Sequence, residues 1–214
     1  TIIIRSYTFG DVDSSKVMLD QNKKRIFDFP KIEYTLRTIN SVIKSCELAK
    51  EYFKNVNIKI IITDDKSSKE SLDRMDRILK KSDLKTELIN LKEDEFNDQI
   101  KTIDTDGKNI SKNMISNMRN LFKSIQIAET EETDLFYFLE DDYIHTKEAI
   151  TEMLFSYEKI SSQLNRELFL CPADYPYLYS SLDDSKIFFG NMRHWRSVNE
   201  TLITFLTSKK MIIK

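Results

Sequence analysis

Three consecutive carboxylates, Glu140, Asp141 and Asp142, follow an unbroken apolar run at residues 135–139. Such a run favours a buried strand of a parallel sheet, and open α/β sheets bind ligands just past the carboxyl ends of their strands. Carboxylates this close repel one another, so a cation would stabilise their charged forms. Their hard oxygen atoms suit Mn2+ or Mg2+, which often share such sites with substrate phosphates. The alternative interpretation is a solvated strand-to-helix turn, in which Asp142 helps to cap the next helix.

A second acidic pair, Asp64 and Asp65, follows an apolar run at residues 58–62 that is rich in β-branched side chains. This run also favours a buried strand. Because the carboxyl ends of parallel strands meet at one edge of a sheet, we expect the pair and the acidic triplet to face the same edge. Acids also suit the first turn of a helix, where the helix dipole favours negative charge, so a structural role stays open for both residues.

The composition excludes several classes of protein and of site. Three glycines, Gly10, Gly107 and Gly190, form neither of the glycine-rich loops that cradle nucleotide phosphates. Lys and Arg total 33 against 35 Asp and Glu, which leaves no basic footprint for nucleic acid. Cys46 and Cys171 suggest neither a disulfide framework nor a zinc site. No apolar stretch approaches the ~18 residues of a membrane span, so we expect a cytoplasmic protein without a transmembrane segment, with peripheral membrane association left open.

Strands that alternate with helices predict an α/β fold with a doubly wound, mostly parallel sheet. Apolar runs predict strands at residues 1–4, 58–62, 86–91, 135–139 and 168–171. Helical spacing of apolar residues predicts helices over 34–53, from a capping box at 67–70 to residue 79, over 111–130, and after residue 146 through 164. Residues 187–189, 193–196 and 202–206 are expected to form strands of a smaller element, which antiparallel pairing would suit.

This arrangement resembles the GT-A class of nucleotide-sugar glycosyltransferases, a Rossmann-like fold, and especially its family-2-like group. The resemblance rests on a first strand at residues 2–8, a second strand ending at residues 64 and 65, the DxD-type sequence at 140–142, and a strand-to-helix segment at 204–210. It implies one domain over residues 1–214, with a nucleotide-sugar-binding half (1–142) and an acceptor-side half (143–214). It also implies transfer of a sugar from a nucleotide-diphosphate donor to an acceptor hydroxyl.

The resemblance assigns roles to particular residues. The nucleotide would be bound by Arg5, Ser6, Tyr7, Thr8, Asp64, Asp65 and Asp141. Among these, Asp64 or Asp65 would accept a hydrogen bond from the base. Asp142, assisted by Glu140 or Asp141, would hold Mn2+ or Mg2+ against the donor diphosphate. That ion would neutralise the charge that develops on the leaving diphosphate.

A basic and aromatic strip, Arg193-His194-Trp195-Arg196, has two interpretations. It could close over the diphosphate or the acceptor, because Arg pairs bidentately with phosphate. It could equally pack around Trp195 as a structural anchor. An inverting transferase also needs a carboxylate that deprotonates the acceptor hydroxyl. Weak candidates within the chain are Asp174, Asp183, Asp184 and Glu200.

The resemblance places the usual general base in a segment that would follow Lys214, so we expect residues 1–214 to bind a donor better than they turn it over. The expected partners are a nucleotide-sugar donor and a glycan, lipid-linked or protein acceptor. Two other functions stay open. One is a nucleotidyltransferase, which also uses acids at strand ends with Mg2+. The other is a non-catalytic GT-A-like domain that binds sugars or partners through Tyr175, Tyr177, Tyr179 and Trp195.

Overall fold

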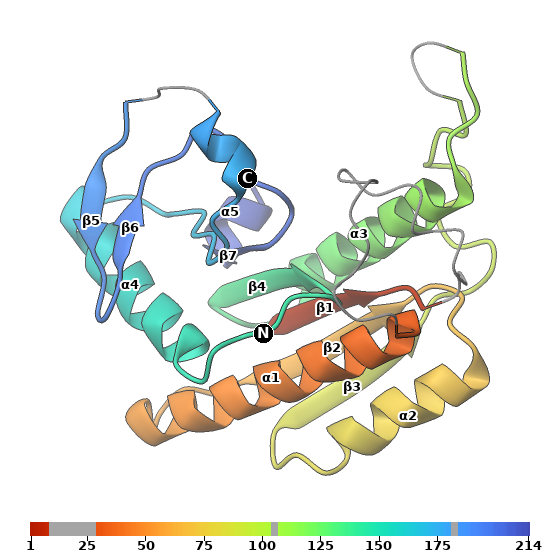
Figure 1. The fold of residues 1–214 in the computed structure, drawn as a ribbon, viewed down its shortest axis with the longest axis horizontal. Coiled ribbons are helices and arrows are strands. Elements are labelled where there is room, and N and C mark those ends of the chain that lie inside the picture. The colour runs from red at the N-terminus through yellow and green to blue at the C-terminus, as the bar shows by residue number, and fades with distance from the viewer. Residues whose placement is uncertain (9–28, 104–106, 181–183) are drawn as a thin grey trace.

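A computed structural model describes residues 1–8, 29–103, 107–180 and 184–214 of the chain. Its centre is a five-stranded sheet of order β3-β2-β1-β4-β7 (Figure 1). The strands are β1 (Ile2–Ser6), β2 (Lys59–Asp64), β3 (Lys85–Asn90), β4 (Leu135–Glu140) and β7 (Phe205–Ser208). The first four run parallel, and β7 pairs antiparallel with β4. The α/β class with a mostly parallel sheet is therefore confirmed.

Helices cover both faces of the sheet. They are α1 (Lys31–Tyr52), α2 (Lys69–Leu79), α3 (Lys112–Thr130), α4 (Ala149–Leu164) and the short α5 (Lys209–Ile212). Because side chains alternate along a strand, Ile2 and Ile4 of β1 pack with α1, α2 and α4, whereas Ile3 packs with α3. Each fully buried side chain of this kind contributes about 1.5–3 kcal/mol. Because helices pack on both faces of the sheet, the strands and the acids at their ends are held in place.

The C-terminal part differs from the prediction in two ways. Residues 202–206 were expected in the smaller element, but the strand β7 belongs to the central sheet, where Leu135 is in register with Ser208. Residues 168–171 were expected to form a strand, but the segment makes only an isolated bridge between Leu170 and Leu206. The strand-to-helix segment at the end of the chain is confirmed, because α5 begins directly after β7.

Helix starts agree with the prediction to within a few residues. The helix expected over 111–130 begins at Lys112, and Ser111 is its N-cap, which accepts a hydrogen bond from the backbone N–H of Met114. The cap of α2 is Ser68 instead of Ser67, because Ser67 turns back to bind Asp64. None of the helices in the described parts of the chain is long and apolar enough to cross a membrane.

A two-stranded antiparallel hairpin, β5 (Ile187–Phe189) and β6 (His194–Arg196), packs on α4. One buried carboxylate anchors it: Glu152 accepts hydrogen bonds from the backbone N–H groups of Asn191, Met192 and Arg193 and from the side chains of Ser156 and Trp195. Burial acts to raise the pKa of Glu152, but these donors outweigh it and hold the pKa below its ordinary value. A Cβ atom at Gly190 would lie 2.3 Å from Glu152 Oε1, so this close approach requires glycine.

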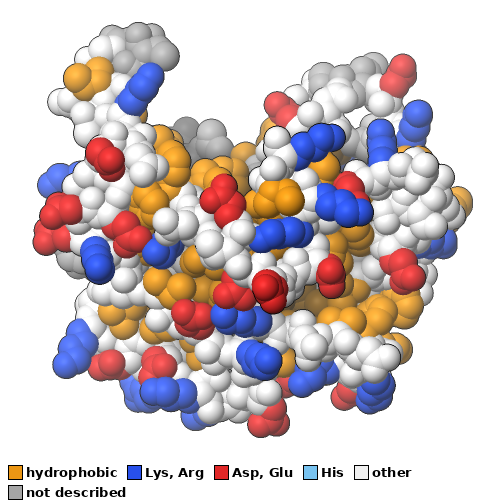
Figure 2. Space-filling view, turned by 180° about the vertical axis from the view of Figure 1, so that it is seen from behind, with side chains coloured by type: hydrophobic (Ala, Val, Ile, Leu, Met, Phe, Trp, Pro, Cys, Tyr) orange, Lys and Arg blue, Asp and Glu red, His pale blue; other side chains and the backbone are white. Residues whose placement is uncertain are grey.

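Charged side chains of both signs are interspersed over the face drawn in Figure 2. This agrees with the near balance of 33 basic and 35 acidic residues in the chain. Several large apolar side chains on the C-terminal part are exposed, among them Phe169, Tyr179, Ile187 and Phe189.

Candidate functional site

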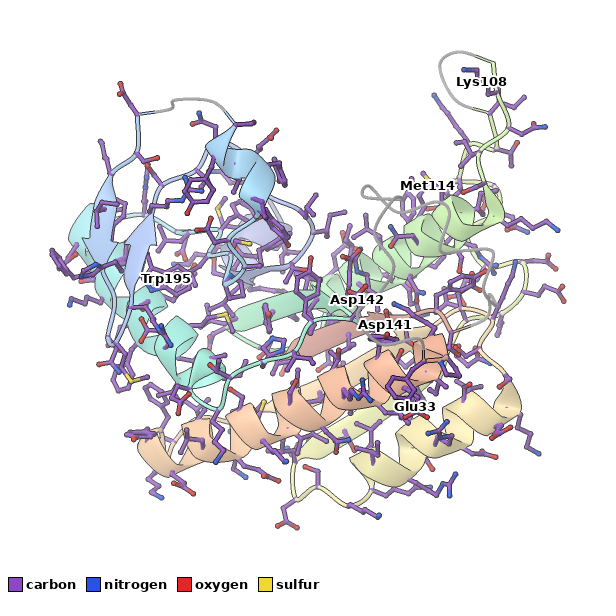
Figure 3. All side chains as sticks on the ribbon, viewed as in Figure 1. Glu33, Lys108, Met114, Asp141, Asp142 and Trp195 are labelled. Carbon is purple, nitrogen blue, oxygen red and sulfur yellow. The ribbon has the colours of Figure 1, made fainter. Side chains whose placement is uncertain are left out.

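The carboxyl edge of the central sheet brings together the acidic strand ends that the sequence predicts. β1 lies between β2 and β4, and its residues Arg5 and Ser6 are in register with Glu140 and Asp64 respectively. The two acids that follow Glu140 lie beside the N-terminal end of α1 (Figure 3). The acids of β2 and β4 therefore face one edge, as expected.

Asp141 is the buried member of the triplet. Its Oδ1 lies 2.7 Å from Lys31 Nζ, and its Oδ2 accepts a hydrogen bond of 2.7 Å from the Thr35 hydroxyl. The backbone N–H of Tyr7 also donates to Oδ2, at 3.4 Å. Because Lys31 and Thr35 are one turn apart, a single face of α1 binds this carboxylate. Asp141 thus joins the ends of β1 and β4 to α1.

Glu140 and Asp142 are more accessible. Their side chains are 35% and 26% exposed, compared with 7% for Asp141. Glu140 Oε1 lies 3.3 Å from Arg5 Nη2, and Asp142 Oδ2 lies 3.6 Å from Lys31 Nζ. Burial raises the pKa of Glu140, although the positive charge of Arg5 opposes the shift. Two of the three acids can therefore meet a ligand without unfolding their surroundings.

The residues at the end of β1 have different environments. Arg5 is 3% exposed, and its Nη2 donates to the carbonyl of Ile203 at 3.0 Å. Its Nε and Nη1 have no hydrogen-bond partner among the described residues. Ser6 is fully buried, and the hydroxyl of Thr8 donates to Ser67 at 2.6 Å. Arg5 is thus the β1 residue that carries positive charge to the acidic edge.

Asp64 is fully buried and has no cation beside it in the described structure. Its Oδ2 accepts the backbone N–H of Ser67 at 3.0 Å, and its Oδ1 accepts the Ser67 hydroxyl. Burial raises the pKa of Asp64 to about 6, even though the hydrogen bonds from Ser67 lower it. Asp64 is therefore a candidate for a functional residue, although perturbed acids also occur in purely structural settings.

Asp65, the next residue, is bound by a buried arginine. Arg119 Nη1 lies 3.1 Å from Asp65 Oδ1, and the hydroxyl of Ser116 donates to Oδ2 at 2.6 Å. Arg119 also donates to the carbonyls of Lys92, Glu93 and Glu95. Both partners are 1% exposed, so this pair ties α3 and the loop after β3 to the end of β2. Of the two acids predicted to contact the base, Asp64 is the one for which the described residues provide no charged partner.

No three His, Cys, Asp or Glu side chains in the described parts of the chain converge in the manner of a metal cage. Mg2+, however, is usually bound by one or two carboxylates together with substrate phosphates and water. The two accessible acids of the triplet, Glu140 and Asp142, are of this kind. The metal site stays a prediction.

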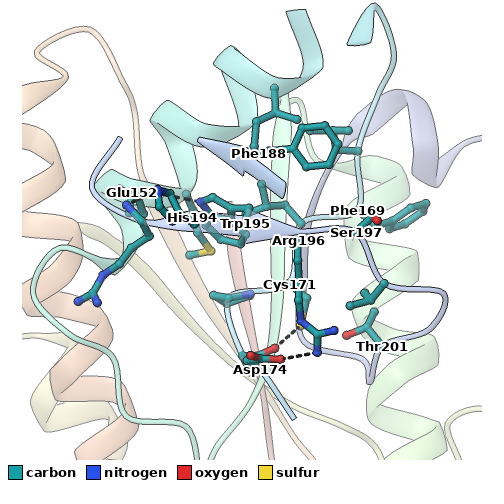
Figure 4. A pocket seen from close by; sticks show the side chains of 18 of the residues that line it. Glu152, Phe169, Cys171, Asp174, Phe188, His194, Trp195, Arg196, Ser197 and Thr201 are labelled. Atoms are coloured by element: carbon teal, nitrogen blue, oxygen red, sulfur yellow. Dashed lines mark hydrogen bonds and ion pairs between the residues drawn. The ribbon is translucent and has the colours of Figure 1, made fainter. Parts of the chain in front are cut away.

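A second feature is a cavity of about 670 Å3 between α4, residues 166–174 and the β5–β6 hairpin (Figure 4). Cavities of about 300–1,000 Å3 with mostly apolar walls are typical of small-molecule sites. The apolar lining includes Met153, Leu168, Leu170, Phe188 and Trp195. Arg196 Nη2 lies 2.9 Å from Asp174 Oδ1 in this cavity, and the Tyr179 hydroxyl also donates to Asp174. These two donors hold the pKa of Asp174 below its ordinary value.

The strip of residues 193–196 lines this cavity. Trp195 is a packed anchor, since its Nε1 donates to Glu152 at 3.1 Å. Arg196 lies over the ring of Tyr179, with its guanidinium carbon 4.3 Å from the ring centroid. Within the described residues, the hydrogen bonds and ion pairs of the strip reach the cavity and α4 but not the acidic triplet. These contacts favour the structural interpretation of Trp195, and a role of the strip at the diphosphate or the acceptor stays a prediction.

The four weak candidates for a general base differ in position. Asp174 lines the cavity, and Asp184 and Glu200 are exposed. Asp183 lies outside the described residues. A hydrogen bond of 2.8 Å between the hydroxyls of Tyr143 and Tyr175 connects the segment after the acidic triplet to the loop that carries Asp174.

Sequence reasoning missed the positive partners of the acids. Lys31 lies before the helix predicted over residues 34–53, although it is the first residue of α1, and Arg119 was not singled out within its helix. The available signal for Lys31 was its position directly after Pro30, because proline commonly precedes or begins a helix. For Arg119 the sequence offers only a charged residue on an apolar face.

The fold and the edge together define an α/β protein in which acidic residues gather at the carboxyl ends of parallel strands. Comparison with protein-family models, curated proteins and solved structures found no significant match. The function of the protein must therefore be inferred from the geometry and chemistry of its own residues.

Proposed function

We propose that the chain is a metal-dependent glycosyltransferase that binds a nucleotide-diphosphate sugar at the carboxyl edge of the sheet. The observation that carries this proposal is the edge itself, where two accessible acids, Glu140 and Asp142, end one strand and Asp64, a buried acid with no cation beside it among the described residues, ends another. Ligands of open α/β sheets bind at this edge. The proposed position of the donor follows from these three residues.

The nucleotide would lie over the ends of β1 and β2. Asp64 is suited to a base N–H donor, because its buried carboxylate gains more from one added hydrogen bond than an exposed acid would. Asp65 would support this contact indirectly, since Arg119 and Ser116 already hold it in place. The backbone at Tyr7 and Thr8, fixed by Asp141 and Ser67, would form the floor of the nucleotide site.

The acids of β4 fit a divalent ion that is shared with the donor. Asp142 and Glu140 would hold Mn2+ or Mg2+, while Asp141 keeps its bonds to α1 and positions Asp142. When bound, the ion would neutralise charge on the departing diphosphate. Arg5, two of whose nitrogen atoms have no hydrogen-bond partner among the described residues, would add a second positive charge near the same phosphates.

The cavity beside the β5–β6 hairpin would receive the acceptor. Its apolar walls suit the ring faces of a sugar or the apolar part of a lipid-linked acceptor. Asp174 would accept the proton of the attacking hydroxyl, because Arg196 and Tyr179 keep it ionised at neutral pH. The lowered pKa makes it a weak base, so we expect slow transfer from residues 1–214.

Isothermal titration calorimetry with a panel of nucleoside diphosphates, with and without Mn2+, tests this proposal. We expect one diphosphate to bind only with Mn2+, and Asp142→Asn to abolish that binding. Asp83→Asn, which removes an exposed acid between α2 and β3, serves as the matched control and should bind as the parent does.

Three other results would contradict the proposal. Binding that is equal with and without Mn2+ would remove the metal role. Turnover of a nucleoside triphosphate would indicate a nucleotidyltransferase. Absence of any nucleotide binding would favour a domain that binds sugars or partners through the cavity.

A further inference from the structure

Lys31 gives the acidic edge a positive charge of its own. It is the first residue of α1, and its side chain is 19% exposed. Its ammonium lies 2.7 Å from Asp141 Oδ1 and 3.6 Å from Asp142 Oδ2. The position next to two acids is the one that a divalent ion would favour, so Lys31 and the ion are competitors for the same charge.

The contacts of Lys31 with Asp141 and Asp142 are unequal. Asp141 is nearly buried and is also bound by the Thr35 hydroxyl and the Tyr7 backbone, so its place is fixed. Asp142 is more exposed, and its distance to Lys31 is longer than a direct hydrogen bond. A divalent ion can therefore bind Asp142 and displace Lys31 from it, while Lys31 stays bound to Asp141.

We propose that Lys31 is a tethered counter-ion, which a divalent ion displaces from Asp142 and which then contacts the metal-bound diphosphate of the donor. This inference rests on the proposed function, because it assigns Lys31 to the same site. Lysine suits the role, since its ammonium is a compact charge on a flexible stem and can move between neighbouring oxygen atoms. Lys31 would thus weaken metal binding before the donor arrives and strengthen diphosphate binding afterwards.

The proposal predicts effects of opposite sign for Lys31→Met. Mn2+ alone, followed by electron paramagnetic resonance of the free ion, should bind about tenfold more tightly, because two neighbouring acids lose their resident cation. Inorganic pyrophosphate, titrated in saturating Mn2+, should bind about tenfold more weakly, because a phosphate contact is lost. Lys31→Arg keeps the charge and should lie between the parent and Lys31→Met in both titrations.

Lys44→Met is the matched control, since Lys44 is an exposed lysine on the same helix and the charge change is identical. It should leave both affinities unchanged. If Lys31→Met weakens Mn2+ binding and pyrophosphate binding together, Lys31 only clamps α1 to β4 and the proposal is wrong. Unchanged Mn2+ affinity, or tighter Mn2+ binding with unchanged pyrophosphate affinity, would also overturn it.

The Mn2+ titration needs no nucleotide, so it separates this inference from the proposed function. If the parent binds no nucleoside diphosphate but Lys31→Met still gains Mn2+ affinity and loses pyrophosphate affinity, the proposed function fails and the role of Lys31 stands. Thermal unfolding of each variant, followed by circular dichroism, confirms that the folded protein is being titrated.

Discussion

The two acidic strand ends of the sheet look alike in sequence but differ in structure. At the end of β2 both acids are fully buried, and the ion pair found there within the described parts of the chain joins Asp65 to Arg119. At the end of β4 the acids share two cations, Arg5 and Lys31, and two of the three side chains remain partly exposed. The first end has fixed partners, whereas the second has partners that a ligand can replace.

This difference shows that an acid at a strand end can have a structural role or a ligand-binding role, depending on the residues around it. A buried ion pair such as Asp65–Arg119 costs desolvation and holds only while both partners are present. A partly exposed acid loses little when it exchanges one cation for another. We therefore expect substitutions at the end of β2 to change stability, and substitutions at the exposed acids of β4 to change binding.

The largest effect is expected for Arg119→Met. This change leaves the buried charge of Asp65 without its cation and removes the donor for three loop carbonyls. Breaking a buried pair in this way typically costs about 3–5 kcal/mol. Urea denaturation should show a loss of that size in the free energy of unfolding.

The control for this variant is Arg77→Met, an exposed arginine on α2, which should change stability by less than ~0.5 kcal/mol. The double variant Arg119→Met with Asp65→Asn should recover part of the loss, because no unpaired charge is then buried. A loss in Arg119→Met no larger than that in Arg77→Met would mean that the pair does not hold the end of β2.

Asp64→Asn should have the opposite effect to Arg119→Met, because it should increase the free energy of unfolding at neutral pH. Because burial raises the pKa of Asp64 from 3.8 to about 6, the folded state favours the protonated acid. The contribution of protonated Asp64 to the stability of the parent is fully present below pH ~3.8. It falls as the pH rises through about 6 and is absent above that pH. The pKa difference corresponds to roughly 3 kcal/mol, which is the upper bound for the gain at pH 7.

Denaturation curves at several values between pH 4 and pH 7 measure this effect. The parent should lose stability across that window, and Asp64→Asn should flatten the loss. Asp73→Asn, an exposed acid on α2, should keep the slope of the parent. The same slope in Asp64→Asn would show that Asp64 has an ordinary pKa. A stabilised variant that also binds nucleotide less tightly would identify Asp64 as an acid retained for binding.

Most helices and strands could be predicted because the sequence pattern that identifies each one lies within its own residues. Apolar runs located β1 to β4, and helical spacing located the helices, since each pattern reports the buried face of its own element. The partner of β7 is not local. Its pairing with β4 joins Leu135 to Ser208, and nothing near either residue specifies that contact. The sequence therefore indicated a strand there but assigned it to the wrong sheet.

The candidate site could be predicted only as far as its acids. Their position after apolar runs placed them at the sheet edge, because parallel strands end together. Which cation each acid meets depends on contacts that are distant in sequence: Arg119 is 54 residues from Asp65, and Thr35 is 106 residues from Asp141. Without those contacts, Asp64 and Asp65 could not be told apart, and nothing showed that Asp141 would be nearly buried while Asp142 stays partly exposed.

Among these substitutions, Asp142→Asn should reduce the free energy of unfolding least. Asp141→Asn, at the neighbouring residue of the same strand end, provides the comparison. Asp141 accepts hydrogen bonds from Thr35 and Tyr7 and an ion pair from Lys31 in a nearly buried place, so its neutralisation should cost about 1–3 kcal/mol. Asp142 has one longer contact with Lys31 and is partly exposed, so the cost there should stay below ~1 kcal/mol. Urea denaturation of both variants measures the difference. Equal losses would mean that the two acids are held alike, and the division between a structural Asp141 and a ligand-binding Asp142 would then be wrong.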